Sequence, residues 1–227
     1  TQQNLYEHHV IFNHLSKLYL NKKLPNKILL SGEKGIGKAT LGYHLINFVL
    51  SEDEEHSYDF KNNKINLENK SFKLIQNKSN PNFNLIDVAE DKKNIDINQI
   101  RELIVNLNKS SFNNKKRFVL IDNIELLNLN SINALLKVLE EPNENINFIL
   151  INNNKRVLPT LKSRCLNYKI HLTSSESFDI TNKILEKNYT DLVDDQIMNY
   201  YSTPGELLNL LDFSIKNNKI NLENKSF

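Results

Sequence analysis

Five short apolar runs, each separated from the next by a segment long enough for a helix, constrain the fold most strongly. The runs cover residues 27–31, 83–88, 117–122, 148–152 and 166–170. Strands that alternate with helices are typical of a parallel sheet with helices on both faces. We therefore expect an α/β domain with a five-stranded parallel sheet over residues 1–172.

The pattern changes after the fifth run. Three helical patterns follow, at residues 175–187, 191–201 and 204–216, and they predict a small helical second domain over residues 173–216. Within the first domain, residues 51–81 are polar with little periodicity. We expect that segment to form a long surface excursion.

A glycine-rich stretch directly follows the first apolar run. Residues 32–40 read Gly-Glu-Lys-Gly-Ile-Gly-Lys-Ala-Thr, and a helical pattern covers residues 38–50. In a phosphate-binding loop, backbone N–H groups between the glycines face the phosphates and the lysine neutralises them. The pattern predicts that a nucleotide's phosphates bind at the loop's Gly32, Gly35, Gly37 and Lys38. A glycine-rich turn kept only for folding is the alternative interpretation.

Two positions that would carry chemistry in such a site are altered. Ala39 stands where a hydroxyl would hold Mg²⁺, and Thr40 lies about 100° further round the helix,. Asp122, at the end of the third run, is the candidate metal ligand, but Asn123 follows where hydrolysis would need a carboxylate,. We expect slow or absent hydrolysis, and the sequence leaves open whether ATP or ADP binds with Mg²⁺ without being hydrolysed.

The composition limits the compartment and the partners. A net charge of +2 gives no argument for binding nucleic acid through bulk electrostatics,. The single cysteine, Cys165, excludes a disulfide framework and a cysteine-based zinc site made by this chain alone,. No apolar run approaches the roughly 20 residues of a membrane span,. We expect a cytoplasmic protein with no membrane partner.

Two further stretches carry a family resemblance. Residues 131–142 read Ser-Ile-Asn-Ala-Leu-Leu-Lys-Val-Leu-Glu-Glu-Pro, and residues 158–165 read Leu-Pro-Thr-Leu-Lys-Ser-Arg-Cys. Together with their distance from the glycine-rich loop, they resemble bacterial clamp-loader subunits over about residues 10–170 and more loosely to 215. The altered loop and the missing acid resemble the delta-prime type of DNA polymerase III more than its ATP-hydrolysing tau/gamma type.

The resemblance implies an AAA+ P-loop module followed by a three-helix lid. It also implies that Arg164 is an arginine finger, which acts on ATP held by a neighbouring subunit, and that Asn152 occupies a sensor position. Glu206, after Pro204 and Gly205, stands near the place where active relatives carry a sensor arginine. No zinc is expected, because residues 51–81 contain no cysteine.

The partners that the resemblance implies are the tau/gamma-type ATPase, the delta subunit, the sliding clamp through the complex, and primed DNA near the nucleoid. Lys115, Lys116, Arg117 and Lys137 are candidates for a DNA-facing surface, with a solvated surface as the alternative. The family's C-terminal helical collar has no counterpart here, and we expect the chain to be a fragment.

The sequence also leaves two alternative functions open and contains one internal repeat. An independent P-loop ATPase of the tau/gamma type is the main alternative, and a small-molecule kinase ranks last. Twelve residues at 61–72 recur at 216–227, so 217–227 are expected to be a tail that duplicates part of 61–72. A recent duplication or an artefact explains such a repeat, and no function is assigned to it.

Overall fold

A computed structural model describes residues 2–89, 92–109, 115–140, 145–155, 157–186 and 201–216. The chain divides into two compact units. The first comprises residues up to 32 together with 38–170, and the second comprises residues 33–37 together with the chain from 171 onward.

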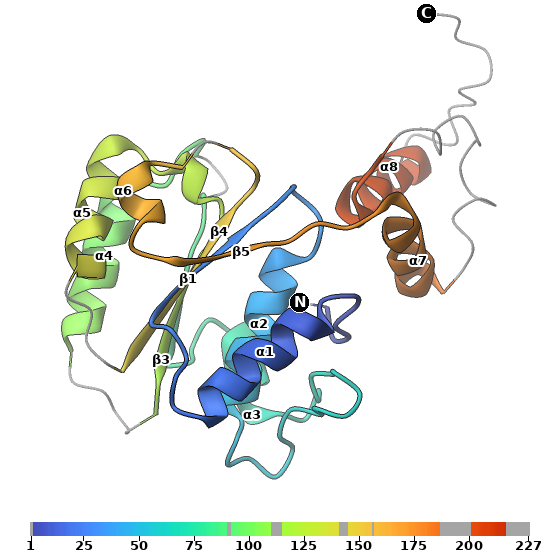
Figure 1. The fold of residues 1–227 in the computed structure, drawn as a ribbon, viewed down its shortest axis with the longest axis horizontal. Helices are drawn as coiled ribbons and strands as arrows, with labels where there is room; N and C mark the ends of the chain where they lie inside the picture. The colour runs from blue at the N-terminus through green and yellow to red at the C-terminus, as the bar shows by residue number, and fades with distance from the viewer. Residues whose placement is uncertain are drawn as a thin grey trace, which may run out of the picture. The chain divides into compact units, whose positions relative to one another are not determined.

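A five-stranded sheet in the order β2-β3-β4-β1-β5 forms the centre of the first unit (Figure 1). All of its strand pairs are parallel. The strands are β1 (Lys27–Ser31), β2 (Phe83–Ile86), β3 (Arg117–Ile121), β4 (Ile146–Asn152) and β5 (Leu166–Lys169). The predicted α/β fold with a parallel five-stranded sheet is confirmed.

Helices cover both faces of this sheet. Figure 1 shows α4 and α5 on one face and α1 and α2 on the other. The first unit contains α1 (His9–Leu20), α2 (Lys38–Leu50), α3 (Lys70–Gln76), α4 (Ile97–Asn108), the 3-10 turn η1 (Ile124–Leu126), α5 (Leu129–Glu140) and α6 (Pro159–Lys162). Asp96 caps α4, and Gln99 bonds back to complete a capping box,.

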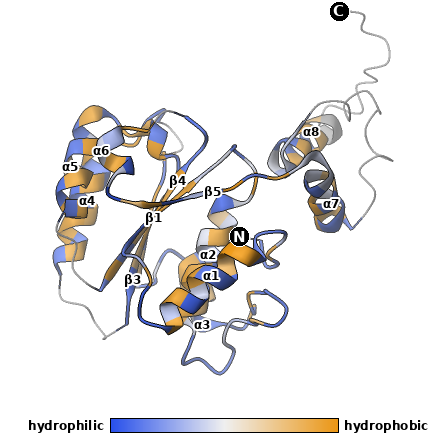
Figure 2. Cartoon of the chain, in the orientation of Figure 1, coloured by the Kyte–Doolittle hydropathy of each residue, from blue (hydrophilic) through white to orange (hydrophobic). Residues whose placement is uncertain are grey.

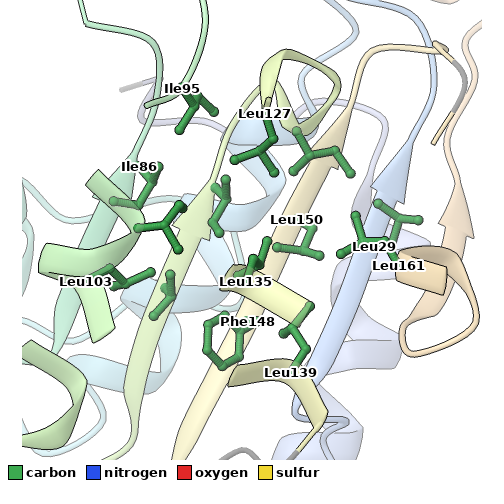
Figure 3. Close-up of a cluster of buried hydrophobic side chains, with 14 of the residues drawn as sticks. Leu29, Ile86, Ile95, Leu103, Leu127, Leu135, Leu139, Phe148, Leu150 and Leu161 are labelled. Carbon is green, nitrogen blue, oxygen red and sulfur yellow. The ribbon is translucent and has the colours of Figure 1, made fainter. Parts of the chain in front are cut away.

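Alternation along the strands separates two apolar layers. Val119, Phe148 and Leu150 belong to the layer under α4 and α5, where Leu135 and Leu139 meet them (Figure 3). The helices in Figure 2 accordingly carry both hydrophobic and hydrophilic stripes,. On the other face α2 approaches so closely at Gly42 that a Cβ there would lie 3.2 Å from Leu120 Cδ1.

The segment 51–81 differs from the predicted surface excursion, because it contains α3 and contributes to a packed layer. Its buried side chains include Tyr58, Ile65 and Phe72. Asn69 caps α3 by accepting from Phe72 N, and its side chain also bonds Asn47 on α2. The apolar residues here are few and irregularly spaced, so periodicity gave no signal.

The second unit contains α7 (Ser174–Leu185) and α8 (Pro204–Lys216). Leu207 and Leu211 form its buried core, with Phe178 and Leu185 packed against them. The predicted helix at 191–201 and the tail at 217–227 lie outside the described residues, apart from residue 201. Within the described part of the chain, no helix is both long and apolar enough to cross a membrane.

Candidate functional site

The start of the glycine-rich loop is fixed at the carboxyl end of β1. Gly32 N donates to Asn152 O at 3.2 Å, which ties the loop to the end of β4. Lys38, the first residue of α2, is only 3% exposed, and its Nζ donates to Gly32 O at 2.9 Å. The Asn152 side chain donates to Lys155 O at 3.0 Å, while its buried Oδ1 accepts no hydrogen bond from the residues that the structure describes. Gly32, Lys38 and Asn152 therefore converge at one edge of the sheet.

The middle of the loop needs its glycines. Gly35 and Gly37 have φ of 89° and 91°, a region that L residues rarely adopt,. Within the second unit, Gly35 O accepts from Gly205 N at 3.0 Å. A Cβ at Gly35 would lie 2.5 Å from Thr203 Oγ1, and one at Gly205 would lie 2.7 Å from Gly35 Cα. Neither glycine tolerates a side chain while this contact is made.

Glu206 has a structural role in the second unit. Its Oε2 accepts from Thr203 N at 2.9 Å, and Glu206 N donates to Thr203 Oγ1 at 3.3 Å. This reciprocal pair is a capping box at the start of α8. The carboxylate that stands near a sensor arginine's place is thus used to begin the helix.

The two residues after Lys38 provide no clear metal ligand. Ala39 carries no oxygen, and Thr40 is half-buried on the first turn of α2. Among the described residues, no group of three or more His, Cys, Asp or Glu side chains is arranged to hold a metal ion. Ala39 therefore offers no side-chain oxygen to a cation at the position that follows the lysine.

Asp122 lies directly after β3, at the same edge of the sheet as the loop. Burial raises the pKa of its carboxyl group, and the charges of Asp87 and Glu125 raise it further. The backbone N–H of Asn123, which donates to Asp122 Oδ1 at 2.8 Å, and the charge of Lys38 act in the opposite direction. The protonated form is thus favoured relative to a free aspartate, which makes Asp122 a poorer cation ligand.

Asn123 is held in a polar network. It has φ of 56° and ψ of 48°, and its Nδ2 donates to Asp87 Oδ1 at 2.8 Å. Its Oδ1 accepts from Asn153 Nδ2 at 2.7 Å, and that nitrogen also reaches Glu125 Oε1 at 3.0 Å. An amide suits this position because it donates to one neighbour and accepts from another. A carboxylate there would face Asp87 with like charge.

Arg164 lies in the turn between α6 and β5, held by two acceptors. Its Nη1 donates to Thr160 O and its Nη2 pairs with Glu140 Oε1, each at 2.7 Å. Ser163 Oγ donates to the same Thr160 carbonyl at 3.2 Å. Cys165 packs against the core, and burial raises the pKa of its thiol to about 11. In the Ser-Arg-Cys triplet, Ser163 thus stabilises the turn, Arg164 presents a guanidinium at the surface, and the protonated Cys165 thiol packs against the core.

Arg164 and Gly32, the first residue of the glycine-rich loop, lie at opposite ends of neighbouring parallel strands. Strands β1 and β5 are parallel, with Ile28 opposite Leu166. Gly32 is four residues beyond Ile28, at the carboxyl end, whereas Arg164 precedes Leu166 at the amino end. At about 3.3 Å per residue, the six residue levels between Arg164 and Gly32 correspond to roughly 20 Å along the strand direction. Arg164 therefore lies far from Gly32, where the loop of its own chain begins.

The candidate DNA-facing cations have different environments. Arg117 is buried and donates to Leu107 O, Lys109 O and Asn106 O, so its guanidinium ends α4 instead of facing solvent. Lys115 pairs with Asp53 at 3.2 Å. The expectation that Arg117 lines a DNA-facing surface is therefore wrong.

The sequence matches a family model over most of the described first unit. The model described as DNA polymerase III, delta subunit, matches residues 7–174. The chain belongs to this family. The predicted resemblance to bacterial delta-prime subunits is thereby confirmed.

Individual members support this assignment. A DNA polymerase III subunit gamma from Buchnera aphidicola (subsp. Schizaphis graminum) is 31% identical over 210 residues, which cover 89% of this chain and 55% of that protein. A subunit delta' from Pseudomonas aeruginosa is 32% identical over 139 residues, covering 61% of this chain and 40% of that protein. The chain spans about half the length of the curated relatives that it matches.

Solved structures agree on the fold. A gamma subunit-related protein from Thermotoga maritima superposes with a TM-score of 0.58 at 20% identity, covering 88% of this chain and 57% of that one. A RuvB variant from the same organism gives a TM-score of 0.51 at 15% identity, over 92% and 60% of the two chains. At these identities the likeness concerns the fold alone.

Sequence reasoning missed the residues that hold the candidate site residues in place. Asp87 and Asn153, which bind Asn123, come from different strand ends and have no motif of their own. Glu140 was part of the quoted stretch but was given no role, although it pairs with Arg164. Its position 24 residues before Arg164 gave no local signal.

Proposed function

We propose that this member of the delta-subunit family is a delta-prime-like clamp-loader subunit of the DNA polymerase III holoenzyme. It hydrolyses little or no ATP itself, and it provides Arg164 as an arginine finger to ATP on a neighbouring subunit. In this role the first unit is an AAA+ P-loop module and the second is its helical lid.

The position of Arg164 carries this proposal. A surface guanidinium at the amino edge of the sheet, remote from the chain's own loop, suits a nucleotide bound by another molecule. An arginine finger in trans raises phosphoryl-transfer rates by about 10³–10⁵, because its charge meets that developing on the transferred group. The family membership supports the same role, since the stretch 7–174 contains Arg164.

The chain's own loop supports binding more than hydrolysis. The glycine backbone N–H groups and the Lys38 ammonium suit a phosphate group. The residues do not fit Mg²⁺ chemistry well, because Ala39 replaces the hydroxyl ligand and Asn123 is engaged by Asp87 and Asn153. ATP or ADP bound here would serve assembly, with no zinc or other metal required.

The partners follow from the same proposal. They are the tau/gamma-type ATPase that receives Arg164, the delta subunit, the sliding clamp through the complex, and primed DNA. With a net charge of +2, DNA contact would depend on local cations such as Lys137 and not on the field of the whole chain. The protein would work in the cytoplasm, close to the nucleoid.

An independent ATPase of the tau/gamma type is the second candidate function. The observation that favours it is the intact lysine, whose charge lowers the pKa of Asp122. That arrangement retains part of a hydrolytic site. The gamma relative at 31% identity adds weight to it.

One experiment with two parts tests both candidates. First, ATP hydrolysis and nucleotide binding are measured for this protein alone, with Lys38→Ala as a control for contaminating ATPases. Second, the ATPase rate of a reconstituted clamp loader is measured with Arg164→Ala. We expect no turnover by the protein alone and a large loss of rate, about 10³-fold, in the complex. Turnover that Lys38→Ala abolishes, or an unchanged rate with Arg164→Ala, would contradict the proposal.

A further inference from the structure

We propose that Glu140 is a positioning residue for Arg164, which holds the guanidinium ready for a neighbour's phosphate. This inference rests on the proposed function of Arg164. It assigns a role to a carboxylate at the last position of α5, which no motif singled out.

Two hydrogen-bond acceptors fix the Arg164 guanidinium. Glu140 Oε1 accepts from Nη2 and Thr160 O accepts from Nη1, both at 2.7 Å. Each acceptor thus takes a different terminal nitrogen, which fixes the plane of the guanidinium as well as its position. Within the described residues, the guanidinium makes no further hydrogen bond. Three of its five N–H donors stay available for a ligand.

Stability of the chain does not explain why a carboxylate stands here. The two side chains are 32% and 53% exposed, and ion pairs at such sites contribute little to folding. A negative charge at the C-terminal end of a helix is also opposed by the helix dipole. Lys27 Nζ, which donates to Leu139 O at 2.9 Å, offsets part of that conflict. The helix dipole disfavours a carboxylate at this position, and folding gains little from the ion pair. The role that remains for Glu140 is to orient the Arg164 guanidinium.

These two hydrogen bonds would orient Arg164 before the chemical step. An unrestrained arginine samples many rotamers and loses that freedom when it binds a phosphate. A guanidinium already fixed by Glu140 and Thr160 loses less, so the transition state on the neighbouring subunit is reached more often. The effect belongs in kcat of the complex and not in the affinity of the neighbour for ATP.

The test uses a reconstituted clamp loader with primed DNA, in which kcat and KM for ATP are measured. The variants are Glu140→Gln, Glu140→Asp, Arg164→Ala and the double variant Glu140→Gln/Arg164→Ala. Glu102→Gln, an exposed glutamate on α4, is the matched control. We expect Glu140→Gln to lower kcat by about three- to fivefold with KM and assembly unchanged, and Glu140→Asp to retain part of the rate. The double variant should match Arg164→Ala.

The outcomes separate this inference from the proposed function. If Arg164→Ala lowers the rate while Glu140→Gln equals the control, the positioning role is wrong and the proposed function stands. A rate that rises in Glu140→Gln would mean that the carboxylate competes with phosphate, which also overturns it. If Arg164→Ala leaves the rate unchanged, the proposed function fails and the role of Glu140 fails with it.

Discussion

Several single residues differ from the pattern that hydrolysis would need, and two of them make structural hydrogen bonds instead. Asn123 donates to Asp87 and accepts from Asn153, and Glu206 caps α8 through Thr203. A carboxylate at position 123 would be opposed by Asp87, and loss of Glu206 would remove a helix cap. Restoring a hydrolytic pattern would therefore conflict with contacts that the fold now uses.

His44 provides a prediction at the same scale. It is fully buried, its Nδ1 lies 2.8 Å from Tyr58 Oη, and its Nε2 lies 3.1 Å from Gln2 O. Because a carbonyl only accepts, Nε2 carries the proton and Nδ1 accepts from the tyrosine. Burial lowers the pKa of His44 from 6.5 to about 4.

The unfolded state then binds more protons than the native state between pH 6.5 and 4, so the contribution of His44 is complete above pH 6.5 and is lost as the pH falls. We expect the free energy of unfolding to drop by about 2 kcal/mol between pH 6.5 and 5, at about 1.4 kcal/mol per pH unit. Urea unfolding at several pH values measures this pH dependence of the free energy of unfolding. His44→Gln should flatten this dependence, and the exposed His56→Gln should not. An equal slope in all three proteins would contradict the prediction.

At the scale of elements, pattern predicted the sheet and most helices because their apolar residues repeat with the right period. The cap of α4 at Asp96 has a local sequence signal, because an acidic residue precedes an amphipathic helix,. The helix α3 was missed because its seven residues lie in a polar stretch and depend on contacts with α2. Asp122 was predicted as the metal ligand of the loop site from its position at the end of the third apolar run, whereas Asn152 was assigned only through the family resemblance. Their supporting contacts depend on strand order, which a single sequence does not display.

Arg117 joins two elements, because it begins β3 and ends α4. Its guanidinium donates to the carbonyls of residues 106, 107 and 109 at the end of the helix,. We expect Arg117→Met to lower the free energy of unfolding by about 2–3 kcal/mol, because three carbonyls at the end of α4 lose charge-assisted hydrogen bonds from a buried guanidinium,. The exposed Arg101→Met on α4 should change it by less than about 0.5 kcal/mol. Chemical denaturation measures both, and similar small losses in the two variants would show that Arg117 is not a structural cap.

At the scale of the whole molecule, the two units differ greatly in the cores that support them. The first contains a sheet buried on both faces, with Phe118, Leu120 and Phe148 wholly inaccessible. Among its described residues, the second has a cluster of Leu207 and Leu211 with Phe178 and Leu185 beside them, and Ile180 is also buried. Fewer buried apolar side chains among the described residues favour local opening at a lower free energy. The second unit is therefore expected to open while the sheet stays folded.

Native-state hydrogen exchange measures this difference. We expect amides of α7 and α8 to exchange through openings of lower free energy than amides of β3 and β4. Leu207→Ala removes a fully buried side chain and should destabilise the second unit by about 2 kcal/mol or more. Exchange of the amides in α7 and α8 would then be about 30-fold faster. Leu210→Ala, at a position 43% exposed, is the matched control and should change little. If Leu207→Ala accelerates the amides of β3 and β4 to the same extent, the chain unfolds as one cooperative unit and the expectation is wrong.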